Sequence, residues 1–499
     1  MTLASLVARK PIAAVTDSLA AESASGAPAL KRSLSALDLV ALGIGAIIGA
    51  GIFSATGSAV AGGGNHIGAG PALIISYLLT AIACGFAALC YAEFAALLPQ
   101  SGSAYTYAYV TLGELCAWII GWDLILEYAV GNIAVAVSWS GYFQHLLAGL
   151  GLHLPPWLVT DVHRGLATGA IRDAAPRLFG VPVLFNLPAL GIVALLTVLL
   201  YIGVKESALF NKIMVAGKLL VILAFVGIGG FYMEPKHLRP FAPNGLTGVL
   251  SGAAVVFFSY IGFDAVSTVA EEARNPQRDM PLGMLGSLAV CTLLYMVVTV
   301  VLCGLLPWHQ LGSDNALVDA LAHKGIHWAA GVLAVGAVGA MTAVLLVFQL
   351  GQPRILYSMA RDGLLPSCFQ RIHPRFRTPS FGTVATGLFV GLPAAVLDIN
   401  DALDLCNIGT LFAFALVSAG VLVLRYLEPD RPRPFRCPGV PLVPLCSIGA
   451  CLLLMAYLPA VAWLRFGLWL LIGIVVYALF GWRNSRLRRP PEAAAASEA

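Results

Sequence analysis

Two apolar stretches of this 499-residue chain are interrupted by residue types that can open a helix backbone. The first contains Gly43-Ile-Gly-Ala-Ile-Ile-Gly-Ala-Gly51, and the second contains Phe258-Ser-Tyr-Ile-Gly-Phe-Asp264. A helix that unwinds at such a point exposes N–H groups at the start of one half, which favour a carboxylate. It exposes C=O groups at the end of the other half, which can accept hydrogen bonds from an ammonium group. Two unwound helices side by side can therefore bind both charges of an α-amino acid.

Other interpretations of the first glycine-rich stretch stay open. Small residues at this spacing also allow two helices to pack closely, and close packing and unwinding are equally compatible with Gly49-Ala50-Gly51. A dinucleotide-binding loop is excluded, because no strand or soluble βαβ unit precedes the glycines. Irregular backbone inside a membrane survives only where protein or a water-filled cavity surrounds it. Paired interruptions in corresponding segments are typical of a transporter site.

Two ionisable residues lie inside apolar segments, where a charge costs at least about 2.5–3.5 kcal/mol on insertion scales. Lys218 has apolar neighbours on both sides. Burial disfavours its charged form, so it could exchange a proton as access alternates. The alternative is a permanent cation that joins its helix to backbone carbonyls of the first span. Glu127 could belong to a proton route, or it could form a structural hydrogen bond to a neighbouring helix; we expect both residues to take part in proton coupling.

No other set of side chains in the sequence indicates catalysis or metal binding. The nine histidines include no pair on one helix face at ligand spacing, and the ten cysteines include no CxxC pair. This pattern argues against a zinc site and against a disulfide framework. No nucleophile, metal cluster or acid–base set converges on adjacent faces. We therefore predict no metal, no cofactor and no enzymatic activity.

The elements that must position these residues are membrane helices. Hydrophobic residues make up 59% of the chain and charged residues 11%, against about 25% charged residues in a soluble domain. A helix needs roughly 20 apolar residues to cross the hydrocarbon core, and runs of that kind predict an all-α integral membrane protein with twelve transmembrane helices. The expected spans are 38–61, 70–97, 113–147, 188–204, 207–231, 246–271, 282–306, 328–358, 380–397, 405–426, 441–463 and 466–482.

Basic residues are distributed unevenly between the two sets of connections. The set that includes both termini and the connections near 98–112 and 354–379 holds about three times as many Lys and Arg residues as the other set. Such an excess marks the cytoplasmic side, so we expect a multi-pass protein of the bacterial inner membrane with both termini cytoplasmic. Residues 1–33 are expected to form a disordered N-terminal tail, and 483–499 a cytoplasmic tail. The net charge of +4 is too small to suggest nucleic acid as a partner.

Several motifs of this chain resemble those of the amino acid–polyamine–organocation superfamily, and within it the bacterial members of the cationic amino acid transporter family. The resemblance covers roughly residues 30–485. The motifs that carry it are Leu-Gly-Ile-Gly-Ala-Ile-Ile-Gly-Ala-Gly-Ile-Phe (42–53), Tyr91-Ala-Glu93-Phe with Pro99-Gln-Ser-Gly102-Ser-Ala-Tyr105, Gly121-Trp-Asp-Leu-Ile-Leu-Glu127-Tyr, Asn211-Lys-Ile-Met-Val-Ala-Gly-Lys218, Tyr260-Ile-Gly-Phe-Asp264 with Glu271-Glu272, and Arg361-Asp-Gly-Leu-Leu-Pro366.

The resemblance implies the leucine-transporter type of fold, in which two inverted repeats of five helices alternate access to a central site. On this chain the repeats are expected over 34–231 and 246–426, followed by two additional transmembrane helices over 441–482. The family is typically proton-coupled, with a lysine of the fifth span near the place where sodium sits in relatives. That lysine corresponds here to Lys218.

The resemblance also implies a substrate site at the two interruptions. The substrate carboxylate would lie on the backbone amides of Ala50 and Gly51. Many family members have Thr where this chain has Ala50, so a hydroxyl contact is absent here. The carbonyls expected to meet the substrate ammonium are those of Ile47, Phe258, Ser259 and Ile261. The full set of expected substrate-binding residues is Ile47, Ile48, Gly49, Ala50, Gly51, Phe258, Ser259, Tyr260, Ile261 and Phe263.

The predicted function is secondary active transport of cationic or neutral L-amino acids by proton-coupled symport. An amino acid/polyamine exchanger is the alternative within the same class. A channel or an amino-acid-sensing receptor belongs to a different class, and a receptor would favour an appended soluble domain, for which the connections are too short. The expected partners are an amino acid, protons and the lipid bilayer. We expect a monomeric functional unit, and a small single-span partner subunit is left open.

Overall fold

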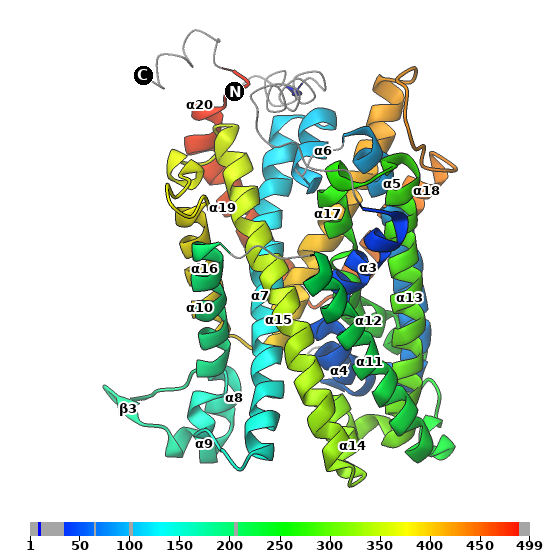
Figure 1. The fold of residues 1–499 in the computed structure, drawn as a ribbon, viewed down its shortest axis with the longest axis vertical. Coiled ribbons are helices and arrows are strands. Elements are labelled where there is room, and N and C mark those ends of the chain that lie inside the picture. Colours follow the sequence, from blue (N-terminus) through cyan, green and yellow to red (C-terminus); the bar gives the residue numbers. More distant parts are fainter. Residues whose placement is uncertain (1–7, 11–33, 64–65, 99–102, 204–207, 489–499) are drawn as a thin grey trace.

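The computed structural model describes residues 8–10, 34–63, 66–98, 103–203 and 208–488, and they are mostly helical. The long helices lie side by side and form one bundle (Figure 1). Within the described residues, eight helices are long and apolar enough to cross a membrane, and a bent pair, Ala36–Ile47 with Gly51–Ala61, provides a ninth span. Three shorter apolar helices are Leu187–Ile202, Ser380–Ala394 and Leu442–Ala456. A mostly helical fold with eight or nine candidate membrane spans among the described residues is therefore confirmed.

The elements follow one another along the chain with short connections. The helices of the bundle and its connections are α3 (Ala36–Ile47), α4 (Thr56–Ala61), α5 (Leu73–Leu97), α6 (Ser103–Thr111), α7 (Glu114–Gly149), α8 (Val162–Ala167), α9 (Gly169–Ala174), α10 (Leu187–Ile202), α11 (Ala208–Tyr232), α12 (Gly245–Val256), α13 (Pro276–Leu305), α14 (Ala316–His323), α15 (His327–Arg361), α16 (Ser380–Ala394), α17 (Ile399–Leu427), α18 (Leu442–Ala456), α19 (Ala460–Val476) and α20 (Trp482–Asn484).

Short helical turns and two small hairpins join these helices. The turns are η1 (Gly51–Ala55), η2 (Gly70–Ala72), η3 (Pro156–Leu158), η4 (Pro235–Leu238), η5 (Phe257–Tyr260), η6 (Phe263–Glu272), η7 (Trp308–Gln310), η8 (Ser367–Gln370) and η9 (Tyr477–Gly481). The antiparallel hairpins are β1 (Gly62–Gly63) with β2 (His66–Ile67), and β3 (Arg177–Leu178) with β4 (Val181–Pro182).

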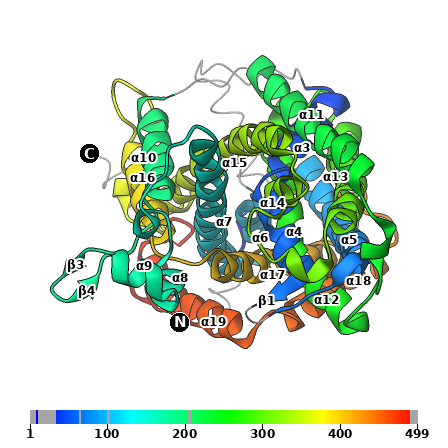
Figure 2. The ribbon, with the colours of Figure 1, turned by 90° about the horizontal axis from the view of Figure 1, so that it is seen from below.

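Helix α7 is the central element of the bundle. Its 36 residues correspond to about 54 Å at 1.5 Å per residue, so it is longer than the hydrocarbon core is thick. It packs against α15 and α17, and in the view along the bundle it lies between the pair α10–α16 and the group that contains α3 and α13 (Figure 2). Helix α13 in turn contacts both α3 and α5. The first interrupted segment is thus packed against α13, with α11 and α15 also in contact with α3.

Polar caps fix where several of these helices begin. The Ser35 side chain accepts a hydrogen bond from the Asp38 backbone N–H, and the Asp38 carboxylate accepts one from the Ser35 N–H, which is a complete capping box at the start of α3. Asn186 caps α10 and Asp398 caps α17 through their side-chain oxygens. These short polar residues satisfy N–H groups that a helix start leaves without a partner.

The predicted boundaries are wrong at the last two helices. A turn was expected at 464–465, but the chain turns at 457–459, and α19 begins at Ala460 so that Arg465 lies inside a helix. Pro459 explains the difference, because a proline disfavours helical backbone in the residue before it and cannot donate a backbone hydrogen bond itself. The tenth span also begins earlier than expected, at Ile399 after the cap of Asp398.

A short part of the predicted N-terminal tail contacts the end of the bundle that carries α6 and α20 (Figure 1). The backbone N–H of Lys10 donates to the carbonyl of Tyr109 at 3.2 Å, and its ammonium lies 2.9 Å from the carboxylate of Asp362. The Tyr105 hydroxyl donates to the same carboxylate at 2.8 Å. The remainder of 1–33, and 489–499 of the C-terminal tail, lie outside the described residues.

A buried ion cluster joins α5 to α17 and to the segment before α18. The carboxylate of Glu93 accepts hydrogen bonds from Arg425 at 3.0 and 2.8 Å and from the backbone N–H of Cys437 at 2.8 Å. Its oxygen also lies 3.1 Å from the guanidinium of Arg433, and the Glu93 and Arg433 side chains are each only 1% exposed. Removal of the carboxylate would leave a buried cation without its counter-charge.

We therefore expect Glu93→Ala to lower the free energy of unfolding by about 3–5 kcal/mol, the usual cost of breaking a buried pair. The measurement is the thermal unfolding of purified protein in detergent. Glu428→Ala is the control, because Glu428 pairs with Arg431 in an ion pair whose side chains are 40% and 30% exposed, and such pairs contribute about 0–1 kcal/mol. Equal shifts in the two variants would contradict the stabilising role of the cluster.

Candidate functional site

The first interruption is a bend between α3 and α4. Helix α3 ends at Ile47, the backbone of Ile48 is extended with φ −75° and ψ 102°, and the helical pieces on either side differ in direction by 46°. Gly51 is required immediately after the bend, because a Cβ atom there would lie 2.4 Å from the Cα atom of Ser259. The first interruption is therefore in direct contact with the second one.

The second interruption divides the segment that was expected to span 246–271. Helix α12 ends at Val256, the backbone of Ile261 is extended, and Gly262 has φ 115°, a left-handed conformation that favours glycine. A Cβ atom at Gly262 would also lie 2.8 Å from the carbonyl oxygen of Ala46. Both segments are therefore interrupted, and at each interruption a glycine packs against the backbone of the other segment, so unwinding and close packing occur together.

Lys218 of α11 donates to carbonyl oxygens that the first break leaves free. Its ammonium lies 2.7 Å from the carbonyl oxygen of Gly45 and 3.1 Å from that of Ile48, and the residue is 2% exposed. This contact agrees with the interpretation that Lys218 joins its helix to the first span. A charged donor forms a stronger hydrogen bond than a neutral one. Proton exchange at Lys218 stays a prediction.

Tyr295 of α13 joins the two breaks and was not foreseen from the sequence. Its hydroxyl lies 3.2 Å from the carbonyl oxygen of Ile47 and 3.0 Å from that of Ser259, and its side chain is fully buried. A tyrosine in an apolar span needs a partner for its hydroxyl when it is buried. That requirement is the signal in the sequence that could have pointed to Tyr295, although not to these two carbonyls.

The structure brings most of the expected substrate-binding residues together at the breaks. Gly51 touches Ser259, and the carbonyl of Phe258 accepts the backbone N–H of Ile261 at 3.3 Å. Within the described part of the chain, the members of the set with at most 5% exposure are Ile47, Ile48, Ala50, Phe258, Ser259, Tyr260, Ile261 and Phe263. Gly49 is also buried and lies against α15, where an added Cβ atom would be 2.9 Å from the Val344 side chain.

Two aromatic side chains among the expected substrate-binding residues contact neighbouring helices. The Tyr260 hydroxyl donates to the Tyr77 carbonyl at 2.9 Å and lies 3.1 Å from the Thr292 hydroxyl. The ring of Phe263 packs against Phe414 of α17 with a centroid distance of 5.0 Å. The contacts of both side chains are therefore with neighbouring helices.

Glu127 does not lie with Lys218. It is 2% exposed on α7 and lies beside Thr410 of α17, near the carboxylate of Asp264. Its carbonyl oxygen accepts the thiol of Cys406, also of α17, at 3.6 Å. The two residues expected to carry protons therefore contact different helices: Lys218 contacts α3, and Glu127 contacts α17.

Several buried polar atoms of α7 and of the turns η1 and η5 have no hydrogen-bond partner among the described residues. They are the hydroxyls of Ser54, Ser138 and Ser259 and both side-chain atoms of Asn132. Buried polar groups are normally hydrogen-bonded, so each of these atoms is a candidate to meet water or a ligand. Asn132 and Ser138 of α7 were missed because single polar residues in a long apolar helix also occur as helix–helix contacts.

The first break continues into a contact with α7. The hydroxyl of Tyr142 donates to the carbonyl oxygen of Phe53 at 2.6 Å, and the two rings pack edge to face. Tyr142 is fully buried. The turn η1 is therefore packed against α7, on the side of the breaks that faces α14 (Figure 1).

Across the residues that the structure describes, no group of three His, Cys, Asp or Glu side chains could hold a metal ion.

The sequence matches a family and a set of known proteins. The family model described as amino acid permease matches residues 34–480. The branched-chain amino acid permease BcaP of Bacillus subtilis is 48% identical over 95% of this chain and 98% of its own length. A methylthioribose transporter of the same bacterium is 45% identical over 98% of this chain and its whole length. The vacuolar cationic amino acid transporter 4 of Arabidopsis thaliana is 39% identical over 88% of this chain and 68% of its own length.

These relatives are permeases and transporters rather than enzymes, which agrees with the absence of a catalytic constellation in the sequence. The family match covers both helix breaks, Lys218 and Tyr295. It extends past the end of α19 to residue 480, within η9. The resemblance seen in the motifs is confirmed. On these grounds, this multi-pass membrane protein belongs to the amino acid permease family.

Proposed function

We propose that this chain is a secondary active transporter of cationic or neutral L-amino acids in the bacterial inner membrane, with both termini in the cytoplasm. One observation carries the proposal. The carbonyl oxygens of Ile47 and Ser259, one from each break, lie within 3.2 Å of a single hydroxyl, that of Tyr295. A donor with more than one proton could bond both carbonyls at once, and an ammonium group has three.

The proposed architecture has twelve transmembrane helices in the leucine-transporter arrangement. The first repeat is 34–231, the inverted second repeat is 246–426, and 441–482 contributes the two additional helices. The support for this division is that the first helix of each proposed repeat is interrupted: α3 and α4 meet at a 46° bend, and α12 gives way to the turns η5 and η6 around the left-handed Gly262. Paired breaks of this kind are typical of the substrate site between inverted repeats. We propose a monomer as the functional unit.

We propose that the substrate ammonium replaces the Tyr295 hydroxyl between the two carbonyls. The substrate carboxylate would lie on the backbone amides of Ala50 and Gly51, at the start of the second half of the first span. Charge-assisted hydrogen bonds are about twice as strong as neutral ones, so an ammonium can displace a phenol. The Tyr295 hydroxyl then donates to these carbonyls whenever the site is empty, which lowers the free energy of the empty protein.

We propose that protons drive transport and that Lys218 carries the proton, with Glu127 on the same route. As an ammonium, Lys218 holds the carbonyls of Gly45 and Ile48 and so fastens α3 to α11. A neutral lysine has one donor fewer and no charge, so the same contact becomes weaker and the first span can change its tilt. An exchanger is the alternative, in which a second amino acid or a polyamine replaces the proton as the driving species.

A second cargo deserves the same test because one relative, 45% identical to this chain, is named a methylthioribose transporter. A sugar has hydroxyl donors that suit free backbone carbonyls, but it has no carboxylate for the amides. The test of the proposal is uptake into proteoliposomes of a panel of labelled L-amino acids and methylthioribose, with and without an imposed pH gradient. Uptake of none of the amino acids would contradict the proposed cargo.

Lys218→Ala is expected to abolish proton-driven accumulation. A pH gradient of one unit can support about tenfold accumulation of a substrate that moves with one proton, since it is worth about 1.4 kcal/mol. The variant should show only the level seen without a gradient. Lys236→Ala is the matched control, because Lys236 lies in the connecting turn η4 and its side chain is 74% exposed. Full accumulation in Lys218→Ala would eliminate the proposed lysine carrier.

Tyr295→Phe is expected to tighten substrate binding by about fivefold while it destabilises the empty protein by about 1–3 kcal/mol. The variant leaves two buried carbonyls without a donor, which is costly, and a bound ammonium restores their hydrogen bonds. Thermal unfolding with and without saturating substrate measures both effects, and Tyr232→Phe at the exposed end of α11 serves as the control. Weaker binding in Tyr295→Phe would mean that the hydroxyl contacts the substrate instead of giving way to it.

A further inference from the structure

The connection between α15 and α16 carries three exposed arginines, Arg371, Arg375 and Arg377. Within the part of the chain that the structure describes, none of them forms an ion pair with a carboxylate. By contrast, Arg425 and Arg433 both pair with a buried carboxylate. The three arginines therefore leave an unbalanced positive charge on this connection.

The segment 371–378, which we call the arginine turn, is ordered by its own hydrogen bonds. The backbone N–H of His373 donates to the carbonyl of Thr378, and the N–H of Arg377 donates to the carbonyl of His373, both at 2.8 Å. The Nδ1 atom of His373 also accepts the backbone N–H of Arg375 at 3.2 Å. Orienting a membrane protein requires only an excess of positive charge in a connection, so the order of this turn needs another explanation.

Arg377 has a backbone conformation that residues with a side chain rarely adopt. Its φ is 56°, in the left-handed region that favours glycine. Such a conformation persists only where surrounding contacts hold it, and such residues are concentrated at functional sites. Glycine at this position would remove the strain, so the presence of an arginine indicates that its side chain is used.

The arginine turn is attached to the end of α10. The hydroxyl of Thr378 donates to the carbonyl oxygen of Tyr201 at 2.8 Å. The ring of Tyr201 also packs edge to face against the rings of His373 and Phe376, with centroid distances of 5.4 and 5.9 Å. The three arginines are therefore held where α10 ends and α16 begins.

The pair α10–α16 lies at the edge of the bundle, and both helices present apolar side chains outward (Figure 2). The exposed apolar residues include Leu195, Val198 and Ile202 of α10, and Phe381, Val384 and Leu388 of α16. At this spacing they share one face of each helix. A ligand that covers the turn and the helices needs an anionic group for the arginines and hydrocarbon for the apolar faces.

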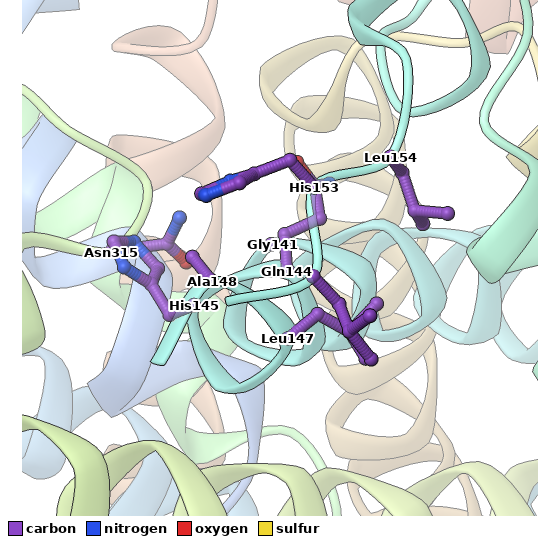
Figure 3. Close-up of a pocket in the computed structure, with 9 residues that line it drawn as sticks. Gly141, Gln144, His145, Leu147, Ala148, His153, Leu154 and Asn315 are labelled. Atoms are coloured by element: carbon purple, nitrogen blue, oxygen red, sulfur yellow. The ribbon is translucent and has the colours of Figure 1, made fainter. Parts of the chain in front are cut away.

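A pocket of about 250 Å³ at the end of α7 has a different character. Figure 3 shows the ring of His153 directed toward Asn315 and His145 across this pocket, and no lysine or arginine is among the described residues that line it. Amides carry no charge and imidazoles are neutral above their pKa, whereas an arginine side chain stays charged. The permanent positive charge that favours a phosphate is therefore on the arginine turn and not in this pocket.

We infer that the arginine turn binds the phosphate group of an anionic phospholipid, whose acyl chains lie along the exposed faces of α10 and α16. Guanidinium groups bind phosphate oxygens through paired N–H donors, and basic groups beside membrane helices bind anionic lipid headgroups. The rings of Tyr201 and Phe376 suit the same depth, because aromatic residues are enriched at the membrane–water interface. This site is separate from the helix breaks and does not depend on the cargo that is proposed for them.

Native mass spectrometry of the purified protein in detergent tests the site. Phosphatidylglycerol or phosphatidylcholine is added in increasing amounts, and the lipid-bound fraction gives an affinity for each. The protein should bind phosphatidylglycerol about tenfold more tightly or better, because each basic residue near an anionic lipid contributes roughly a fivefold effect. The variant with Arg371→Gln, Arg375→Gln and Arg377→Gln should lose this preference. An unchanged preference in the variant would overturn the inference.

The matched control carries Arg172→Gln, Arg177→Gln and Arg239→Gln. These arginines are exposed on other connections, so the control loses the same charge outside the arginine turn, and it should keep the preference for phosphatidylglycerol. Equal loss in both variants would mean that net charge alone decides, which would contradict a site at the turn. Displacement of phosphatidylglycerol by glycerol 3-phosphate at the same concentration would assign the turn to a soluble phosphate and contradict the lipid.

Arg377→Gly separates lipid binding from folding. Glycine adopts the left-handed conformation without strain, so this variant should unfold at the same temperature as the unmodified protein or at a higher one. It should bind phosphatidylglycerol roughly fivefold more weakly, because one cation is lost. Unchanged lipid affinity in Arg377→Gly, at any unfolding temperature, would contradict the role assigned to Arg377.

Discussion

A helix that breaks inside a membrane must find hydrogen-bond partners for the carbonyl groups it frees, and this requirement organises the middle of the molecule. Lipid supplies no such partners, and each buried polar group without one costs several kcal/mol. Lys218 from α11 and Tyr295 from α13 supply donors to Gly45, Ile47, Ile48 and Ser259. The positions of α11 and α13 in the bundle are thus constrained, because each helix supplies a hydrogen-bond donor to carbonyl groups at the breaks.

The two donors, Lys218 and Tyr295, differ in which of the breaks they contact. Lys218 bonds only the first break, whereas Tyr295 connects the first break to the second. The close approach of Gly51 to Ser259 and of Gly262 to Ala46 means that neither break can shift without the other. A change in the donors on one segment is therefore transmitted to its neighbour by direct backbone contact.

The sequence marked the two segments in which breaks could lie, because glycines and polar residues interrupt apolar spans there, but it left close helix packing equally open at Gly49-Ala50-Gly51. It did not allow Tyr295 to be assigned, because a tyrosine in a helix is equally compatible with packing, and the face it turns to depends on neighbours far away in the chain. The same limit applies to Asn132 and Ser138. The turn before α19 was misplaced for a local reason, since Pro459 outweighed a continuous apolar run. Individual helices follow from composition, whereas the contacts between them require the fold.

The proposed recognition of substrate by backbone groups has a consequence for the choice of cargo within the family. Carbonyls and amides at the breaks are independent of side-chain identity, so relatives that share the breaks can differ in what they carry. One relative is named for branched-chain amino acids and another for methylthioribose. The Tyr295 hydroxyl on the carbonyls of Ile47 and Ser259 illustrates the point, because a hydroxyl donor already occupies the place suited to an ammonium. Under this proposal, selectivity comes from the side chains around the breaks, which differ between relatives, rather than from the backbone groups.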